Sequence, residues 1–166
     1  MVDFKKDTWI YILIAAILII ISIFTPAVTY TLDYSAYAGP EFDYVSWLSG
    51  SIMTVDGDWF GNASPTYLFG VAMVAATLFL TFSILSWRGQ EFKWEWLVYL
   101  LCGVFLIIFS ILYFVFATPL DPHLLMHGVA GEKENVMPGF APFGILIAGC
   151  IAVGAFVIDK FTAGRE

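Results

Sequence analysis

The chain has 166 residues, of which 60% are hydrophobic and 13% are charged, and its mean hydropathy is +0.86. Soluble domains average about 45–50% apolar and about 25% charged residues, so this composition excludes an ordinary water-soluble globule. The net charge of −7 disfavours nucleic acid as a partner.

Four apolar segments follow one another along the chain, and none contains a charged residue. They cover residues 9–31, 65–87, 96–120 and 136–158. A helix needs about 20 apolar residues to cross the roughly 30 Å hydrocarbon core of a bilayer, and each segment provides them. We therefore predict an all-α membrane protein, an antiparallel four-helix transmembrane bundle that forms a single domain over residues 1–166.

The charged residues between these segments are unequally divided. The two termini and the short connection 88–95 together hold six basic and six acidic residues, whereas connections 32–64 and 118–135 hold one basic and eight acidic residues. Basic residues concentrate on the cytoplasmic side of membrane proteins. This predicts a multi-pass protein of the cell membrane with both termini in the cytoplasm. The whole net charge then falls on two outer loops, which fits a lipid bilayer and protein partners and does not fit nucleic acid.

The first outer loop, residues 32–64, is rich in aromatic residues, in which a disordered linker would be depleted. We expect it to fold into a small cap over the helix ends. Within it, Ser51–Val55 and Asp58–Phe60 flank Asp56-Gly57, and an Asp-Gly pair suits the tight turn of a β-hairpin. Aromatic side chains are enriched where proteins meet. The residues predicted to contact a partner are Tyr44, Trp47, Trp59 and Phe60.

The same loop contains one acceptor sequence for glycosylation. Asn62 is followed by Ala63 and Ser64, on the side of the membrane where the modification occurs. Pro65 comes next, and the site lies a few residues from the membrane, so both features disfavour its use.

The second outer loop contains a candidate metal site formed by Asp121, His123 and His127. Two histidines four residues apart share one face of a helix and, with a carboxylate, form a ligand set for zinc or copper. Leu124 stands where a metalloprotease helix has its glutamate, so the hydrolytic motif is absent. Metal binding and ordinary interfacial histidines both fit this pattern.

The segment 136–158 carries small residues at helical spacing, namely Gly144, Ala148 and Ala152. Small residues allow helix backbones to approach closely in lipid, where packing holds helices together. This predicts a helix-packing face, used within the bundle or between two copies. The segment 96–120 carries an aromatic stripe at the same spacing: Phe105, Phe109, Tyr113 and Phe116.

The four apolar segments contain no Asp, Glu, Lys, Arg or His. Ion pumps and charged-substrate carriers place such residues within the membrane, and transporter sites show broken, repeated helices. Catalysis and transport within the lipid are therefore disfavoured, and we predict a non-enzymatic protein without a cofactor.

Four segments, cytoplasmic termini, a long first loop with tryptophan and a shorter second loop together resemble the claudin and peripheral-myelin-protein class. The signature of that class is a Trp, then Gly-Leu-Trp, then two spaced Cys in the first loop. Here its only counterpart is Trp47-Leu48-Ser49-Gly50, and both cysteines are absent, so no functional residue is carried over. The resemblance implies a small external sheet and contacts with neighbouring or partner proteins.

The predicted function is that of an integral membrane protein whose acidic, aromatic-rich outer loops contact other membrane proteins or further copies of the chain in a homo-oligomer. Three alternatives stay open. The first is an accessory subunit of a larger membrane complex. The second is an outer-face metal-binding protein or enzyme that uses His123 and His127, and the third is a pore formed by oligomers.

Overall fold

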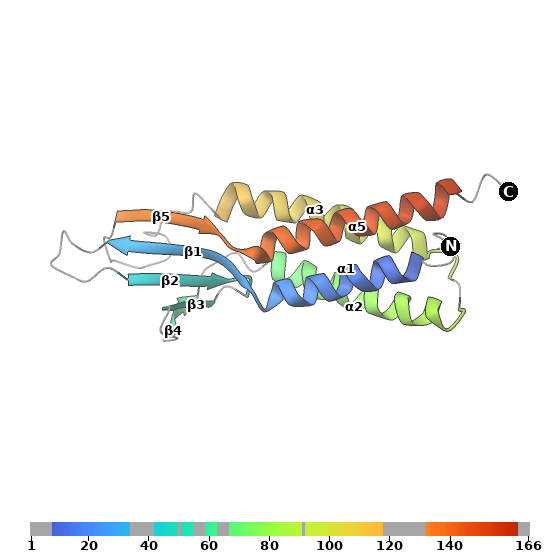
Figure 1. The fold of residues 1–166 in the computed structure, drawn as a ribbon, viewed down its shortest axis with the longest axis horizontal. Helices are drawn as coiled ribbons and strands as arrows, with labels where there is room; N and C mark the ends of the chain where they lie inside the picture. The colour runs from blue at the N-terminus through green and yellow to red at the C-terminus, as the bar shows by residue number, and fades with distance from the viewer. Residues whose placement is uncertain are drawn as a thin grey trace.

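The computed structural model describes residues 8–33, 42–49, 51–54, 59–62, 67–90, 92–117 and 132–162. These residues form four helices that lie side by side and a five-stranded sheet at one end of them (Figure 1). The helices are α1 (Thr8–Ile23), α2 (Tyr67–Trp87), α3 (Glu95–Ala117) and α5 (Phe140–Thr162). The strands are β1 (Pro26–Asp33), β2 (Phe42–Trp47), β3 (Ser51–Thr54), β4 (Trp59–Asn62) and β5 (Glu132–Pro138).

Three of the described helices are long and apolar enough to cross a membrane. These spans are Tyr67–Trp87 in α2, Glu95–Val115 in α3 and Phe140–Ile158 in α5, and they support a membrane protein. Helix α1 has 16 residues. At a rise of 1.5 Å per residue it is about 24 Å long, a few ångströms less than the roughly 30 Å hydrocarbon core, and a bilayer accommodates such a mismatch by local thinning.

The helices pack in a ring in which α5 contacts α1 and α3, and α2 contacts α1 and α3. Small residues fill much of the space between them, including the fully buried Ala15, Ala16, Ala72, Ala148 and Ala152. A hydrogen bond of 2.8 Å from Ser83 Oγ to the carbonyl of Trp9 joins α2 to α1. Large apolar side chains on the outside of the bundle stay about half exposed, such as Ile14, Ile17 and Ile21 of α1. This arrangement suits a hydrocarbon surrounding better than water.

The sheet is antiparallel, and its strand order is β4-β3-β2-β1-β5. Strand β1 lies between β2 and β5, so Thr29 is opposite both Val45 and Met137. Strand β1 therefore joins the chain segment before α2 to the segment that leads into α5. Strands β3 and β4 pair with each other, as the pattern around residues 51–60 predicts.

The first helix is shorter than the predicted segment 9–31, because it ends at Ile23 and is followed by a strand. Pro26 has no backbone N–H, and it disfavours a helical conformation at the preceding Thr25. Beyond the proline, β-branched side chains favour a strand. These residues are Val28, Thr29 and Thr31.

The last predicted segment, 136–158, is also divided. Val136–Pro138 belong to β5, and the helix begins at Phe140. The two middle helices lie within three residues of the predicted limits 65–87 and 96–120. The prediction of an all-α chain was therefore too narrow, since the helices carry a five-stranded sheet that takes residues from two predicted helical segments.

The connection between α2 and α3 is a tight turn built on Gly89, whose φ angle is +76°. The Gly89 N–H donates to the carbonyl of Ser86 at 2.9 Å, and the Gln90 N–H donates to the carbonyl of Leu85 at 3.0 Å. This pair of bonds is the Schellman motif, which closes a helix and favours glycine in the left-handed conformation. The turn brings the start of α3 back against the end of α2.

Candidate functional site

The two ends of the helix bundle differ in structure and charge. One end carries the sheet, and the other carries the α2–α3 turn, the start of α1 and the end of α5 (Figure 1). The described basic residues at the turn end are Arg88, Lys93 and Lys160, whereas Lys133 belongs to β5 in the sheet. The Lys160 Nζ atom lies 4.3 Å from the centre of the Trp96 ring, a favourable cation–π contact at this end.

The sheet is connected directly to α1. Helix α1 passes into β1 through Phe24 and Thr25, and the Thr25 Oγ1 atom donates to the carbonyl of Ser22 at 3.0 Å. The Thr25 N–H also donates to the Ser22 carbonyl, at 3.2 Å. These bonds satisfy a carbonyl that the helix end would otherwise leave unpaired. They fix the direction in which β1 leaves the helix.

The sheet is also connected directly to α5, through Gly139. The Gly139 N–H donates to the carbonyl of Ala27 at 2.8 Å. A Cβ atom added at Gly139 would overlap the carbonyl oxygen of Pro26 and lie 2.7 Å from the Pro26 carbonyl carbon. Only glycine therefore allows the two backbones to approach this closely.

The base of the sheet belongs to the same hydrophobic core as the helices. Ala27, Val28 and Leu48 are all buried there. Trp47 is half-buried, and its Nε1 atom is enclosed without a hydrogen-bond partner. Of the predicted contact residues, Trp47 is thus partly withdrawn from the surface.

The other predicted contact residues lie on two strands of the sheet. Tyr44 lies on β2, and Trp59 and Phe60 lie on β4, with β3 between the two strands. Asn62 is the last residue of β4, and the rest of its glycosylation sequence lies outside the described residues.

The predicted metal ligands Asp121, His123 and His127 lie outside the described residues. In the part of the chain that is described, no group of three or more His, Cys, Asp or Glu side chains is arranged to hold a metal ion. Cys102 and Cys150 are both free thiols.

The small residues of α5 face the inside of the bundle. Gly144, Ala148 and Ala152 are all buried, and a Cβ atom added at Gly144 would overlap the Ser22 hydroxyl of α1. A Cβ atom added at Gly103 of α3 would lie 3.2 Å from the Cβ atom of Ala152. This face of α5 is therefore occupied by α1 and α3.

Helices α3 and α5 approach each other closely at Gly103 and Gly149. A Cβ atom added at Gly149 would lie 2.9 Å from the Gly103 carbonyl oxygen, and one added at Gly103 would lie 3.0 Å from the Gly149 carbonyl oxygen. Gly103 was not among the residues predicted for helix packing. The available signal was its position as the single glycine between residues 95 and 117.

A polar cluster that the sequence did not indicate lies at the turn end, where Glu95 begins α3. The Ser86 Oγ atom of α2 donates to Glu95 Oε1 at 2.7 Å, and the Tyr99 hydroxyl donates to the same oxygen. Tyr99 is 2% exposed, and its ring packs edge-to-face on Phe79 and Phe82 of α2. Glu95 therefore links the two helices beside their turn.

Replacing Glu95 with alanine should lower the free energy of unfolding by about 2 kcal/mol. A hydrogen bond to a charged group contributes about 1.5–3 kcal/mol. The lower part of this range applies here because the Glu95 side chain is only half-buried. Glu95→Gln keeps one oxygen acceptor and should cost less. The difference is measured by unfolding the protein in micelles with increasing amounts of a denaturing detergent and monitoring its helical content by circular dichroism. Lys93→Ala on the same turn is the control, because Lys93 is exposed. Equal losses for Glu95→Ala and Lys93→Ala would contradict the role of this cluster.

The sheet has two edge strands. In the described sheet β4 and β5 are edge strands, each hydrogen-bonded to one neighbour. Edge strands present backbone N–H and C=O groups that can pair with an extended segment of another chain.

No protein-family model matches this chain, and no curated protein matches its sequence.

Proposed function

We propose that this chain is a multi-pass protein of the cell membrane whose folded outer segment contacts other proteins, including further copies of the chain. The observation that carries this proposal is the five-stranded sheet at one end of the helices. A connection that only links two helices is typically short and has no ordered structure of its own, whereas long structured loops usually have a function. The direct connections to α1 and α5 would hold such a surface in a fixed orientation.

The distribution of charge supports an outer position for the sheet and a cytoplasmic position for both termini. The turn end has Arg88, Lys93 and Lys160, and the sheet end has Lys133 among several acidic residues. Basic residues favour the cytoplasmic side. The acidic outer segments would favour partners with a basic surface, because complementary charge speeds association and selects the partner.

The resemblance to the claudin and peripheral-myelin-protein class supports the same function. In that class the loops form a small external sheet and contact neighbouring or partner proteins. Here β1 pairs with β2 from the first loop and with β5 from the second. The proposal includes no residue from that class, because its loop cysteines are absent from this chain.

A two-tag experiment tests the proposal. Two copies of the full chain with different affinity tags are co-expressed, solubilised in mild detergent and purified through one tag, and the second tag is measured. Replacing Trp59 and Phe60 of β4 with serine should greatly reduce recovery of the second copy, because the aromatic anchors of an interface carry much of its binding energy.

The matched control removes two aromatic side chains from the opposite end. Phe92 and Trp94 of the turn are 47% and 63% exposed, and their replacement with serine should leave recovery unchanged. Equal recovery from the wild type and the β4 variant would refute self-association through the sheet. Copurification with larger subunits in a fixed ratio would instead favour the accessory-subunit alternative.

A further inference from the structure

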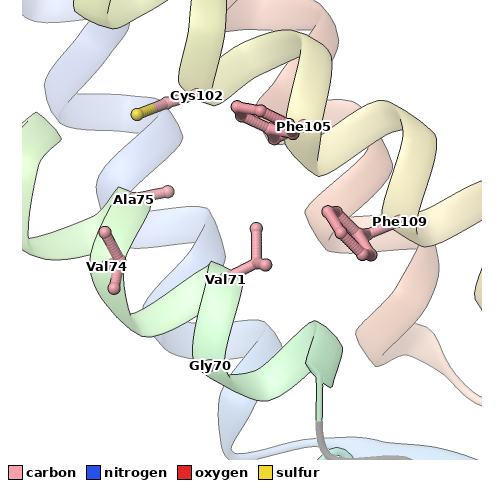
Figure 2. Close-up of a pocket in the computed structure, with 7 residues that line it drawn as sticks. All are labelled: Gly70, Val71, Val74, Ala75, Cys102, Phe105 and Phe109. Atoms are coloured by element: carbon pink, nitrogen blue, oxygen red, sulfur yellow. The ribbon is translucent and has the colours of Figure 1, made fainter.

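A crevice of about 310 Å³ lies between α2 and α3, the most loosely packed of the neighbouring helix pairs. Figure 2 shows side chains from both helices around it. Its lining residues are Gly70, Val71, Val74 and Ala75 of α2 and Cys102, Phe105 and Phe109 of α3.

Small side chains on α2 create this crevice. A Cβ atom added at Gly70 would meet no other atom within 4 Å, so this position leaves open space beside the helix. Val71 and Ala75 continue the same wall with short side chains (Figure 2). On the opposite wall Phe105 and Phe109 are large, but neither closes the gap.

Aromatic pairs join the two helices before and after the crevice along the helix axes. Toward the sheet, the rings of Tyr67 and Phe109 lie 5.7 Å apart. Toward the turn, the rings of Phe79 and Tyr99 lie 6.2 Å apart. The crevice therefore lies between two places where α2 and α3 are in contact, and the two helices are not separated along their whole length.

The walls of the crevice are suited to hydrocarbon. Apart from the Cys102 thiol, they consist of glycine and of aliphatic and aromatic side chains. A water molecule held inside a protein needs two to four polar partners, which these walls do not provide. At the mouth, Val74 is 61% exposed and Phe105 is 50% exposed. Since α2 and α3 both have the length and composition of membrane spans, the mouth would open into lipid.

The shape and position of the crevice favour a single acyl chain. It extends from Gly70 and Phe109 to Ala75 and Cys102, along the helix axes. The seven-residue distance from Cys102 to Phe109 corresponds to about 10 Å of helix. Gly70 is the fourth residue of α2, so the crevice begins near the sheet end. Over this length a volume of about 310 Å³ corresponds to a cross-section of roughly 30 Å², which is smaller than that of a whole helix about 10 Å in diameter.

We propose that the α2–α3 crevice is a binding site for one acyl chain of a phospholipid in the outer leaflet. This inference rests on the membrane-spanning arrangement and the outer position of the sheet in the proposed function. It does not depend on whether the sheet binds a protein. The bound chain fills the space that the short side chains of α2 leave, and so completes the packing of α2 against α3.

Photo-crosslinking of the full chain in phosphatidylcholine vesicles tests the site. The probe is phosphatidylcholine with a diazirine near the middle of one acyl chain, and adducts are located by mass spectrometry of peptides. Adducts should concentrate on residues 67–75 and 102–109. Adducts spread evenly over the outward faces of all helices would overturn the proposal. The absence of adducts from the whole chain would instead refute the membrane-spanning arrangement on which it rests.

Two matched glycine substitutions give an independent test. Gly70→Phe places an aromatic ring in the crevice, whereas Gly154→Phe adds the same ring on α5, where a Cβ atom also meets nothing within 4 Å. In native mass spectrometry with added phosphatidylcholine, lipid retained per chain should fall roughly tenfold for Gly70→Phe, which corresponds to about 1.4 kcal/mol. Retention should be unchanged for Gly154→Phe. Equal retention of lipid by both variants would overturn the proposal. A dimer of the wild type that Gly70→Phe abolishes and Gly154→Phe does not would also overturn it, because the occupant of the crevice would then be a second copy of the chain.

Discussion

Replacing Gly139 with alanine should lower the free energy of unfolding by about 3 kcal/mol and weaken the connection between the sheet and α5. The added Cβ atom would overlap the carbonyl oxygen of Pro26. Because this neighbour is a backbone atom, relief of the overlap requires the base of β1 and the start of α5 to separate. The separation would also weaken the bond of 2.8 Å from the Gly139 N–H to the Ala27 carbonyl. Overpacking costs about 1–3 kcal/mol, and a backbone hydrogen bond contributes about 0.5–1.5 kcal/mol.

Unfolding of the purified chain in mixed micelles, followed by circular dichroism, measures this loss. Limited proteolysis measures whether the segments that form the sheet become accessible. Gly154→Ala is the matched control, because a Cβ atom there meets nothing within 4 Å. Alanine is favoured over glycine inside a helix by about 1 kcal/mol, so the control should be neutral or slightly stabilising. A Gly139→Ala protein as stable and as protease-resistant as this control would show that the close contact is not needed.

The length and composition of the apolar segments were sufficient to predict three helices within a few residues. A bilayer requires about 20 apolar residues in each crossing, and this requirement is strong enough to be read from one sequence. The length requirement could not distinguish a helix from an apolar strand that directly follows the helix in the sequence. Residues 26–31 contain no charge and therefore extended the first predicted helix, although Pro26 marks its end.

The sheet was predicted only in part because its pairings are distant in the sequence. The hairpin of β3 and β4 is local, and the Asp-Gly pair between its strands indicated a turn. The pairing of β1 with β5 joins Val28 to Pro138, about 110 positions away along the chain. No local pattern specifies such a partner, because strand register depends on the surrounding fold.

Packing features that depend on the residue spacing of a single helix can be predicted from the sequence. Those that depend on how two helices are oriented against each other were missed. The spacing of Gly144, Ala148 and Ala152 is a property of one helix, and all three residues are buried. The position of Gly103 opposite Gly149 depends on how α3 is rotated against α5. The α2–α3 crevice likewise depends on where two helices diverge, so its residues do not form a motif along the chain.

Replacing Gly149 with leucine should be the most destabilising of the substitutions considered, with a loss of at least about 3 kcal/mol, since a whole side chain would enter a closely packed contact. A Cβ atom alone would lie 2.9 Å from both the Gly103 carbonyl oxygen and Ile107 Cγ1. Helices α3 and α5 would have to separate to admit the rest of the side chain. Gly154→Leu on the same helix is the control and should retain the wild-type unfolding profile.

The two glycines also predict a specific departure from additivity. Gly103→Ala and Gly149→Ala each place a Cβ atom against the carbonyl oxygen of the other glycine, at 3.0 Å and 2.9 Å. Once the first alanine has forced α3 and α5 apart, the second should find the space already open. The double variant should therefore lose less free energy of unfolding than the sum of the single losses, with a coupling of roughly 1 kcal/mol for residues in direct contact. Strictly additive losses would mean that the two substitutions act on different contacts, and that the reciprocal approach of these backbones does not hold α3 to α5.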